Sequence, residues 1–307
     1  NQAATLSIDD PIDFGAGSGK KVLSFLAPGS STKVELNESM LGGGQVAGLL
    51  RFQNNDLAEG RNLLGRMAIA ISESMNTQNR LGLTLNGQPG ENLFAPISLG
   101  NATPSNFNTS TATMALTVAD PTALQASSYT VSFTAGDAGS VTRHSDGKVF
   151  NFDGSALPPV TVASVFSAQG LGVTLSGAVN AGDQFVINSL QGAAAELQAL
   201  QYSPTDLAAA NPVNAAMGAT NGGSLQLASL KATGPITQPA TGSPVTIAFT
   251  AGSPATYSAT VPGPPVATIA TGNYVSGEKI AINGWEIALQ GAPKSGDTVT
   301  VGNATDS

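Results

Sequence analysis

The chain has 307 residues, enough for two or three domains, and 41% of them are apolar, so we expect sizeable cores. Only 10% are charged and the net charge is -8, which argues against a nucleic-acid partner, because phosphate backbones are bound by basic surfaces. No apolar run approaches the roughly 20 residues that span a bilayer, so no membrane partner is expected, and the lack of cysteine excludes disulfides and thiolate metal sites. Because the chain begins at Asn1 rather than at a methionine, we expect it to be part of a longer protein.

Short alternating segments near the N-terminus predict β-strands. They lie at residues 5–8, 22–26 and 33–36, and turns rich in glycine, serine and proline separate them. Three consecutive glycines at 42–44 then end the strand pattern just before a helical passage.

Residues 45–82 are the long helical passage of the chain. After a short first helix, a break at 53–56 precedes a long helix predicted at about residues 57–81. Asp56 is the expected N-cap of that helix, and Gly82 the expected left-handed residue that ends it.

An apolar stripe recurs along this long helix at helical spacing. Its members are Leu57, Leu64, Met67, Ile71 and Met75. A stripe of this length must be buried against something. We expect Leu64, Met67 and Ile71 to pack against residues 1–50, and the alternative is a partner that lies outside the chain.

From residue 94 onward the pattern is strand and turn, and it repeats. The phrase Phe133-Thr134-Ala135-Gly136 recurs as Phe249-Thr250-Ala251-Gly252, each time after an alternating strand. A Gly-Asp turn follows in both copies, at 182–183 and 296–297. We therefore expect one β module used twice.

The two copies are expected at about residues 128–190 and 245–302, with Leu171 and Trp285 in equivalent places and Phe133 and Phe249 pointing inward.

The predicted fold is therefore mainly β and multi-domain. A helical segment over residues 1–93, with the long helix at about 57–81, is followed by two small β domains at 94–215 and 216–307.

No residue pattern in the chain points to catalysis, a cofactor or a metal. His144 is the only histidine, and it lies in a predicted hairpin turn without a nucleophile elbow, so we expect an exposed turn residue. Residues 15–20 lack the glycine and hydroxyl positions of a phosphate loop. Asp9, Asp10 and Asp13 lack the ordered loop of a calcium site and read as a solvated acidic turn. We predict no enzyme activity, no catalytic residue, no cofactor and no metal site, and we expect His144→Ala to leave the fold intact.

Several phrases of the chain resemble the flagellar hook-associated protein 1 family, the hook–filament junction proteins of bacteria. The matching residues are Gly43 to Phe52, Asn54 to Leu57, Arg61 to Ala68 and Asn76 to Gly90. The phrases Val118 to Leu124, Gly182 to Phe185 and Asp206 to Ala210 look like the outer domains of that family.

The resemblance implies a structural protein of the extracellular bacterial flagellum, which links the hook to the filament. It implies a ring of subunits that contact each other, the hook protein and a second junction protein through terminal helices that these 307 residues lack. Residues 1–93 would then belong to the inner domain, and the two β domains would lie outside it. We expect this chain alone to be monomeric in dilute solution.

The alternative class is an extracellular adhesin or surface-layer β protein, in which tandem β modules rich in threonine and alanine are common. The predicted helix at 57–81, preceded by three glycines, argues against that class.

Overall fold

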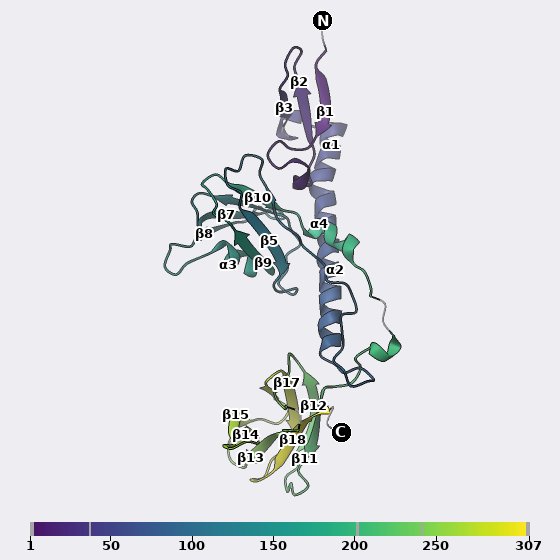
Figure 1. The fold of residues 1–307 in the computed structure, drawn as a ribbon, viewed down its shortest axis with the longest axis vertical. Helices are drawn as coiled ribbons and strands as arrows, with labels where there is room; N and C mark the ends of the chain where they lie inside the picture. The colour runs from purple at the N-terminus through teal and green to yellow at the C-terminus, as the bar shows by residue number, and fades with distance from the viewer. Residues whose placement is uncertain (1–2, 37, 201–202, 241, 305–307) are drawn as a thin grey trace. The chain divides into compact units, whose positions relative to one another are not determined.

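The structure is a computed structural model that describes residues 3–36, 38–200, 203–240 and 242–304. It is mainly β, with one long helix followed by several antiparallel sheets, as predicted (Figure 1).

The chain divides into two compact units, which are described separately. The first unit comprises Asn1–Glu73 and Phe94–Ala199, and the second comprises Ser74–Leu93 and Leu200–Ser307. Each unit contains one part of the long helix and one β domain.

The three strands predicted near the N-terminus form one antiparallel sheet. They are β1 Thr5–Asp9, β2 Val22–Leu26 and β3 Lys33–Leu36, paired in the order β1-β2-β3.

Short helical elements lie between the strands and around the long helix. They are η1 Gly15–Ser18, η2 Glu38–Leu41, α3 Val162–Ser167, α4 Leu190–Ala193, η4 Ala194–Glu196 and η5 Pro204–Asp206.

The helical passage runs without interruption through α1 Gln45–Arg51, the π-helical segment η3 Phe52–Asp56 and α2 Leu57–Arg80. The predicted long helix is confirmed, and α2 is the longest helix that the structure describes. The predicted break at 53–56 and the N-cap role of Asp56 are wrong, because a π-helical turn takes up an extra residue without ending the helix.

The side chain of Asn54 explains why a helix-breaking sequence remains helical here. Its Oδ1 accepts a hydrogen bond from the backbone N–H of Lys21, and its Nδ2 donates to the Lys21 carbonyl, each at 2.8 Å. The amide thus bonds a distant loop and does not compete for the backbone of its own helix.

Gly82 also plays a different part from the one predicted. Its φ is not in the left-handed region, so it is not the expected C′ residue of α2. A Cβ atom at this position would lie 2.6 Å from the carbonyl oxygen of Ala208. Glycine is needed here because the backbone of residue 208 approaches closely.

The prediction that Leu64, Met67 and Ile71 are buried against residues 1–50 is wrong. These side chains are 57%, 58% and 44% exposed. Apart from Ile69, the buried face of α2 instead carries small and amide residues, namely Asn62, Gly65, Ala68, Ser72, Asn76 and Asn79. Small and amide residues allow loops to approach the helix closely and to hydrogen-bond with it.

The first β domain pairs a five-stranded sheet, of order β4-β10-β6-β7-β8, with the two-stranded sheet β5-β9. Its strands are β4 Thr103–Pro104, β5 Thr113–Val118, β6 Tyr129–Phe133, β7 Ala138–Arg143, β8 Val149–Asp153, β9 Leu171–Ser176 and β10 Gln184–Ile187. Met114, Tyr129, Phe166 and Phe185 are fully buried in its core, and Ile69 of α2 joins the same cluster. The core of this domain is therefore built partly on the helix.

The second β domain pairs a five-stranded sheet, of order β11-β18-β13-β14-β15, with the three-stranded sheet β12-β17-β16. Its strands are β11 Val213–Met217, β12 Gln226–Ala232, β13 Val245–Thr250, β14 Ala255–Val261, β15 Ala267–Tyr274, β16 Lys279–Ile282, β17 Trp285–Gln290 and β18 Thr298–Asn303. Its core contains Ile247, Trp285, Ile287 and Leu289.

The two β domains share one topology, so the predicted repeat is confirmed. The strands of the two larger sheets correspond one by one in chain order, and α3 occupies the place in sequence that β16 takes in the second domain. Leu171 and Trp285 open the equivalent strands β9 and β17, and Phe133 and Phe249 are both buried. The repeat begins before the predicted residues, at β4 and β11, and the expected boundary between residues 215 and 216 falls inside β11.

A buried aspartate occupies the same place in both copies. Asp183 accepts hydrogen bonds from the backbone N–H groups of Thr109 and Asn180, both at 2.8 Å. Asp297 accepts the equivalent bonds from the backbone N–H groups of Gly222 and Lys294, again at 2.8 Å. Each carboxylate thus ties the turn before the last strand to the loop after the first strand.

An asparagine completes this arrangement in each copy. Asn108 exchanges two hydrogen bonds with the backbone of Gln184, at 2.7 and 2.9 Å. Asn221 exchanges two with the backbone of Thr298, both at 2.8 Å. The repeat thus extends to single side chains. These two asparagines precede the predicted copies at 128–190 and 245–302, so the predicted repeat does not include them.

A substitution of Gly65 tests how closely the first β domain packs on α2. A Cβ atom there would lie 1.9 Å from the carbonyl oxygen of Leu190 in α4, so Gly65→Ala should destabilise the chain by about 1–3 kcal/mol. Gly60 has nothing within 4 Å of such an atom, so Gly60→Ala should stabilise the helix by about 0.5–1 kcal/mol. Urea unfolding followed by circular dichroism measures both, and equal effects of the two variants would contradict the close packing.

Acid should weaken both β domains through their buried aspartates. Burial alone would raise the pKa of Asp183, but hydrogen bonds from the Ser110 side chain and nearby backbone N–H groups outweigh it and lower the pKa to about 2. Backbone hydrogen bonds, first that of Lys294, also lower the pKa of Asp297. Each carboxylate therefore stabilises its domain fully above its ordinary pKa of 3.8, and this contribution is lost as the pH falls through the lower folded-state pKa.

Thermal unfolding at about pH 5 and about pH 2 measures this loss. Asp183→Asn and Asp297→Asn should be less stable at the higher pH and should lose less on acidification. Glu59→Gln, at an exposed helix position, is the control and should follow the unsubstituted chain. An unchanged acid response in both asparagine variants would show that other groups supply it.

Candidate functional site

The helix α2 presents an exposed apolar face, which we call the apolar stripe of α2. It consists of Leu64, Met67, Ile71 and Met75, which are 57%, 58%, 44% and 44% exposed. Single exposed apolar residues are common, but four in a row at helical spacing mark a surface that another element covers.

Amide side chains on the buried face of the helix, beside the stripe, fix its rotation. Asn76 Oδ1 accepts a hydrogen bond from the backbone N–H of Leu93 at 2.8 Å. Asn79 donates to the carbonyl of Glu91 at 2.7 Å and accepts from the backbone N–H of Ala208 at 3.0 Å. Because these backbone groups, of which that of Leu93 is buried, depend on the two amides, the helix cannot turn its apolar stripe inward without leaving them unpaired.

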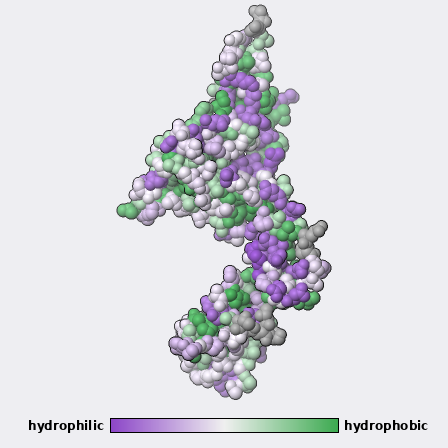
Figure 2. All heavy atoms as spheres, in the orientation of Figure 1, coloured by the Kyte–Doolittle hydropathy of each residue, from purple (hydrophilic) through white to green (hydrophobic). Residues whose placement is uncertain are grey.

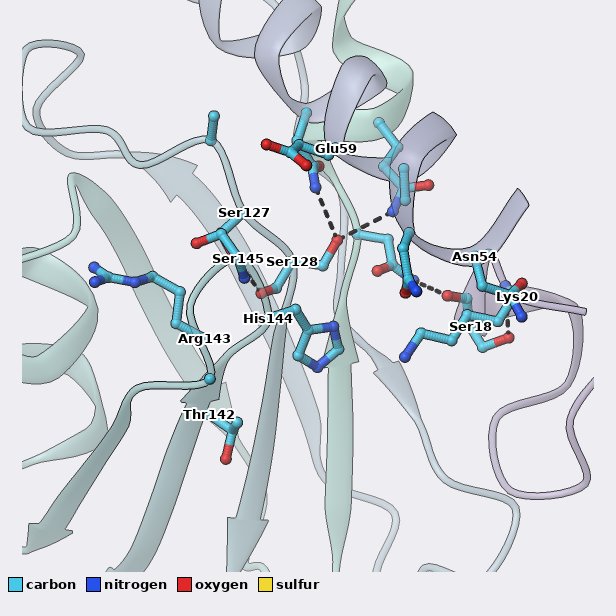
Figure 3. Close-up of a pocket in the computed structure, with 18 residues that line it drawn as sticks. Ser18, Lys20, Asn54, Glu59, Ser127, Ser128, Thr142, Arg143, His144 and Ser145 are labelled. Atoms are coloured by element: carbon cyan, nitrogen blue, oxygen red, sulfur yellow. Dashed lines mark hydrogen bonds between the residues drawn. The ribbon is translucent and has the colours of Figure 1, made fainter. Parts of the chain in front are cut away.

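The first unit also contains a polar pocket of about 420 Å³. Hydroxyl, amide and charged side chains line it, among them Lys20, Asn62, Ser128, Thr142, His144 and Gln191. Ser128 and His144 come from the β domain, and Lys20 and Asn54 come from the loop and helix that face it (Figure 3). The pocket is therefore where the β domain meets the helical segment of its own unit.

His144 is not the exposed turn residue that we expected. It is half-buried in this pocket, and its Nε2 lies 2.8 Å from the hydroxyl oxygen of Thr130. Burial, and then the positive charge of Lys20, lower the pKa of His144 to about 4. The prediction failed because His144 directly follows strand β7. Its backbone N–H donates a hydrogen bond to the carbonyl of Ser128, and this bond holds the residue beside the sheet.

The surroundings of His144 do not form a hydrolase triad. The carboxylate nearest in sequence, Asp146, is held by Arg143 at 2.5 Å, which lowers the pKa of that carboxyl to about 2. The Ser128 hydroxyl is bonded to the amides of Asn62 and Gln191, at 3.3 and 3.1 Å. The imidazole is thus paired with a threonine. A hydrolase triad requires an acid that orients the histidine, and no acid of the described ranges does so here.

The predicted solvated acidic turn is wrong in part, because Asp9 ends strand β1 and lysines pair with Asp9 and Asp10. Lys33 pairs with Asp9 at 2.8 Å and Lys21 pairs with Asp10 at 2.6 Å. Within the described ranges, no group of three or more histidine, aspartate or glutamate side chains is placed to hold a metal ion. In the same ranges, no helix has the length and apolar character that crossing a membrane requires.

The single histidine makes its state directly measurable. The imidazole proton signal should titrate with a pKa near 4 in the folded chain, below the ordinary value of 6.5. Because the unfolded chain then binds the proton more readily, the neutral imidazole stabilises the fold above pH 6.5, and this contribution is lost as the pH falls toward 4.

The charged residues that line the pocket are Lys20, Glu59 and Arg143. Of these, Lys20 supplies the charge that lowers the pKa of His144. Lys20→Met should therefore raise the pKa of His144, whereas Lys279→Met, in the second unit, should leave it unchanged. Titration of His144 at its ordinary value in the unsubstituted chain would contradict the buried environment.

Two family models match the chain. The model described as "Flagellar hook-associated protein FlgK helical domain" matches residues 1–94, and that described as "Flagellar hook-associated protein 1, D2-like domain" matches residues 103–189. Together they cover more than half of the chain.

Curated relatives and one solved structure agree with these models. Flagellar hook-associated protein 1 of Escherichia coli K12 is 30% identical over 190 residues, which are 61% of this chain and 33% of that protein. The same protein of Salmonella typhimurium is 29% identical over 181 residues, 58% of this chain and 31% of the relative. The matched part of the chain thus spans about a third of the length of these curated relatives.

The solved structure of the flagellar hook junction protein FlgK from Burkholderia pseudomallei has a TM-score of 0.70 and 25% identity to the chain, and covers 98% of this chain and 58% of its own. The two family models match the helical segment and the first β domain in chain order, and the solved member covers nearly all of the fold. The chain therefore belongs to the flagellar hook-associated protein 1 family.

Proposed function

We propose that the full-length protein is a structural subunit of the bacterial flagellum that joins the hook to the filament. The observation that carries this proposal is the apolar stripe of α2, which is exposed while the neighbouring face of the helix is hydrogen-bonded to its own chain. Such a surface suits a subunit that is completed by other helical segments. Membership of the hook-associated protein 1 family supports the same role.

The apolar stripe of α2 packs, in this proposal, against helical segments of the full-length protein that lie outside these 307 residues. Those segments also contact the hook protein and a second junction protein, and subunits form a ring outside the cell. Nucleic acid and membrane are not partners. The chain alone is monomeric in dilute solution, because the segments that make the strong contacts are not part of it.

The three domains have different tasks in this proposal. Residues 1–93 belong to the inner domain, and the two β domains that follow, the second of which begins with β11, form the outer part of the subunit. The separate apolar clusters of the two β domains support this division, because each domain has a core of its own.

The protein acts without catalysis in this proposal. The pairing of His144 with Thr130, and of Asp146 with Arg143, supports a structural pocket rather than an active site. Hydrolysis that is lost on His144→Ala would contradict this part of the proposal.

Charged substitutions in the apolar stripe test the proposed role. Met67→Asp and Ile71→Asp in the full-length protein should abolish swimming, because a buried unpaired carboxylate disrupts a helix–helix contact. In the 307-residue chain the same changes should alter the melting temperature little, because both side chains are exposed there.

Thr77→Asp is the matched control, since it adds the same charge at an exposed polar position of α2 that lies off the apolar stripe. Swimming should remain with this variant. Normal swimming with Ile71→Asp, at an unchanged protein level, would contradict the proposed role of the stripe.

A further inference from the structure

Three Asn-Gly pairs occur in the chain, at residues 86–87, 221–222 and 283–284. In such a pair the glycine has no Cβ atom to crowd its backbone nitrogen, and its backbone rotates more freely than that of any other residue. That nitrogen can therefore attack the side-chain carbonyl carbon of the asparagine and convert the amide into a carboxylate. The structure places the three pairs in different surroundings, so we do not expect them to react alike.

Asn86 lies in the turn that follows α2, and its side chain is exposed. Within the described ranges its amide forms no hydrogen bond. The side chain lines a polar cavity of about 470 Å³, and hydrophilic residues gather around this end of α2 (Figures 1 and 2). Water and the reacting groups thus have access to one another here.

The backbone of this first pair is held by little. The Gly87 N–H donates to the carbonyl of Thr84 at 3.0 Å, and this single bond of the turn is what must open before the nitrogen can turn toward the Asn86 side chain. A Cβ atom built on Gly87 would have nothing within 4 Å, so no neighbouring group blocks that rotation.

The second pair has both of its reacting groups bonded to the fold. The Asn221 amide exchanges two hydrogen bonds with the backbone of Thr298, both at 2.8 Å. The Gly222 N–H, which supplies the attacking nitrogen, donates to the buried carboxylate of Asp297 at 2.8 Å. Attack therefore requires that three hydrogen bonds open together, which happens only when this part of the domain unfolds locally.

The third pair forms the tight hairpin between β16 and β17. Asn283 and Gly284 have φ angles of 42° and 93°, as the two central residues of a type I′ turn require. The flanking Ile282 and Trp285 are buried. A Cβ atom on Gly284 would lie 2.2 Å from the carbonyl oxygen of Pro235, so the peptide has no room to rotate while the hairpin persists.

We propose that Asn86 is a modification site, at which the folded chain deamidates spontaneously while Asn221 and Asn283 are protected. The deprotonated backbone nitrogen of Gly87 forms a bond to the side-chain carbonyl carbon of Asn86 and closes a five-membered succinimide ring. The bond from that carbon to the side-chain nitrogen breaks, and the nitrogen leaves as ammonia with the proton that the backbone gave up to solvent. Water then opens the ring at either carbonyl, which gives aspartate or isoaspartate without any oxidation or reduction.

The modification changes a loop that the second unit uses structurally. Leu83 exchanges two backbone hydrogen bonds with Ala210, at 2.9 and 3.2 Å, just before β11 begins. A carboxylate at residue 86 would join Glu91 and Asp206, which line the same cavity, and isoaspartate would add one atom to the backbone of the turn. Both products should weaken the pairing of this loop. The apolar stripe of α2 takes no part, so the modification is independent of the proposed function.

Peptide mass spectrometry of the 307-residue chain, aged at mildly alkaline pH, measures the three sites side by side. Conversion at Asn86 should be at least about tenfold faster than at Asn221 or Asn283, because each protected pair must first break hydrogen bonds or the hairpin. The product at residue 86 should contain isoaspartate, which isoaspartyl methyltransferase labels. Equal rates at the three sites, or a slower rate at Asn86, would overturn the proposal.

The same chain in concentrated urea is the control for the effect of the fold. The three pairs should then react at similar rates, because the reacting groups are the same and nothing holds them. A difference that persists in urea would overturn the claim that the fold selects the site.

Asn86→Gln is the matched variant, since it keeps an amide but would have to close a larger ring. The acidic species that isoelectric focusing detects in the aged chain should be lost in this variant. Hydrogen exchange at the backbone amides of Leu83 and Ala210 should be faster in the aged chain than in the aged variant. An acidic species that forms as fast in Asn86→Gln would place the reaction at another residue and overturn the assignment.

Discussion

The rotation of α2 about its own axis is the constraint on which the rest of the structure depends. Asn76 and Asn79 supply hydrogen bonds to backbone groups of loops that pass the helix, and Gly65 lets α4 approach it. An unpaired buried backbone group costs about 1–3 kcal/mol, and a Cβ or a rotated side chain at Gly65 would meet the backbone of α4, so these contacts oppose any rotation that would bury the apolar stripe. The chain therefore uses the polar face of the helix internally and leaves the apolar face for another partner.

The β domains apply a similar rule to their own turns. Asp183 and Asp297 are the least exposed acids of the two domains, and each is surrounded by backbone N–H groups that no strand could satisfy. Hydrogen bonds of this kind hold a carboxylate in its charged form, which is why the turn persists in both copies although α3 in one is replaced by β16 in the other. The repeat is thus preserved where the backbone needs a partner and varies where only apolar packing is required.

Much of this fold could be predicted from periodicity, because strands, the long helix and the repeat depend on local patterns. The face of α2 that is buried could not, since an apolar stripe tells that a surface is covered without telling which chain covers it. Asn54 shows a second limit: an asparagine reads as a helix breaker, yet its amide bonds the backbone of Lys21 across 33 positions. His144 shows a third, because its pairing with Thr130 and the nearby charge of Lys20 arise only when the β domain and the N-terminal loop fold together. The buried face of α2 did have a signal in the sequence, namely the asparagines at 62, 76 and 79, which recur on one side of the helix.

Exposed apolar surfaces carry a cost that the composition of this chain reduces. Fully burying a large aliphatic side chain contributes about 1.5–3 kcal/mol, so the stripe of α2 alone offers a substantial driving force for assembly. The same force would join chains prematurely if nothing opposed it. The net charge of -8 opposes it at long range, and the many hydroxyl and amide side chains keep the remaining surface hydrated. In the function that we propose, the apolar stripe of α2 becomes buried only when helical segments of the full-length protein are present, so the exposed stripe couples completion of the subunit to its assembly.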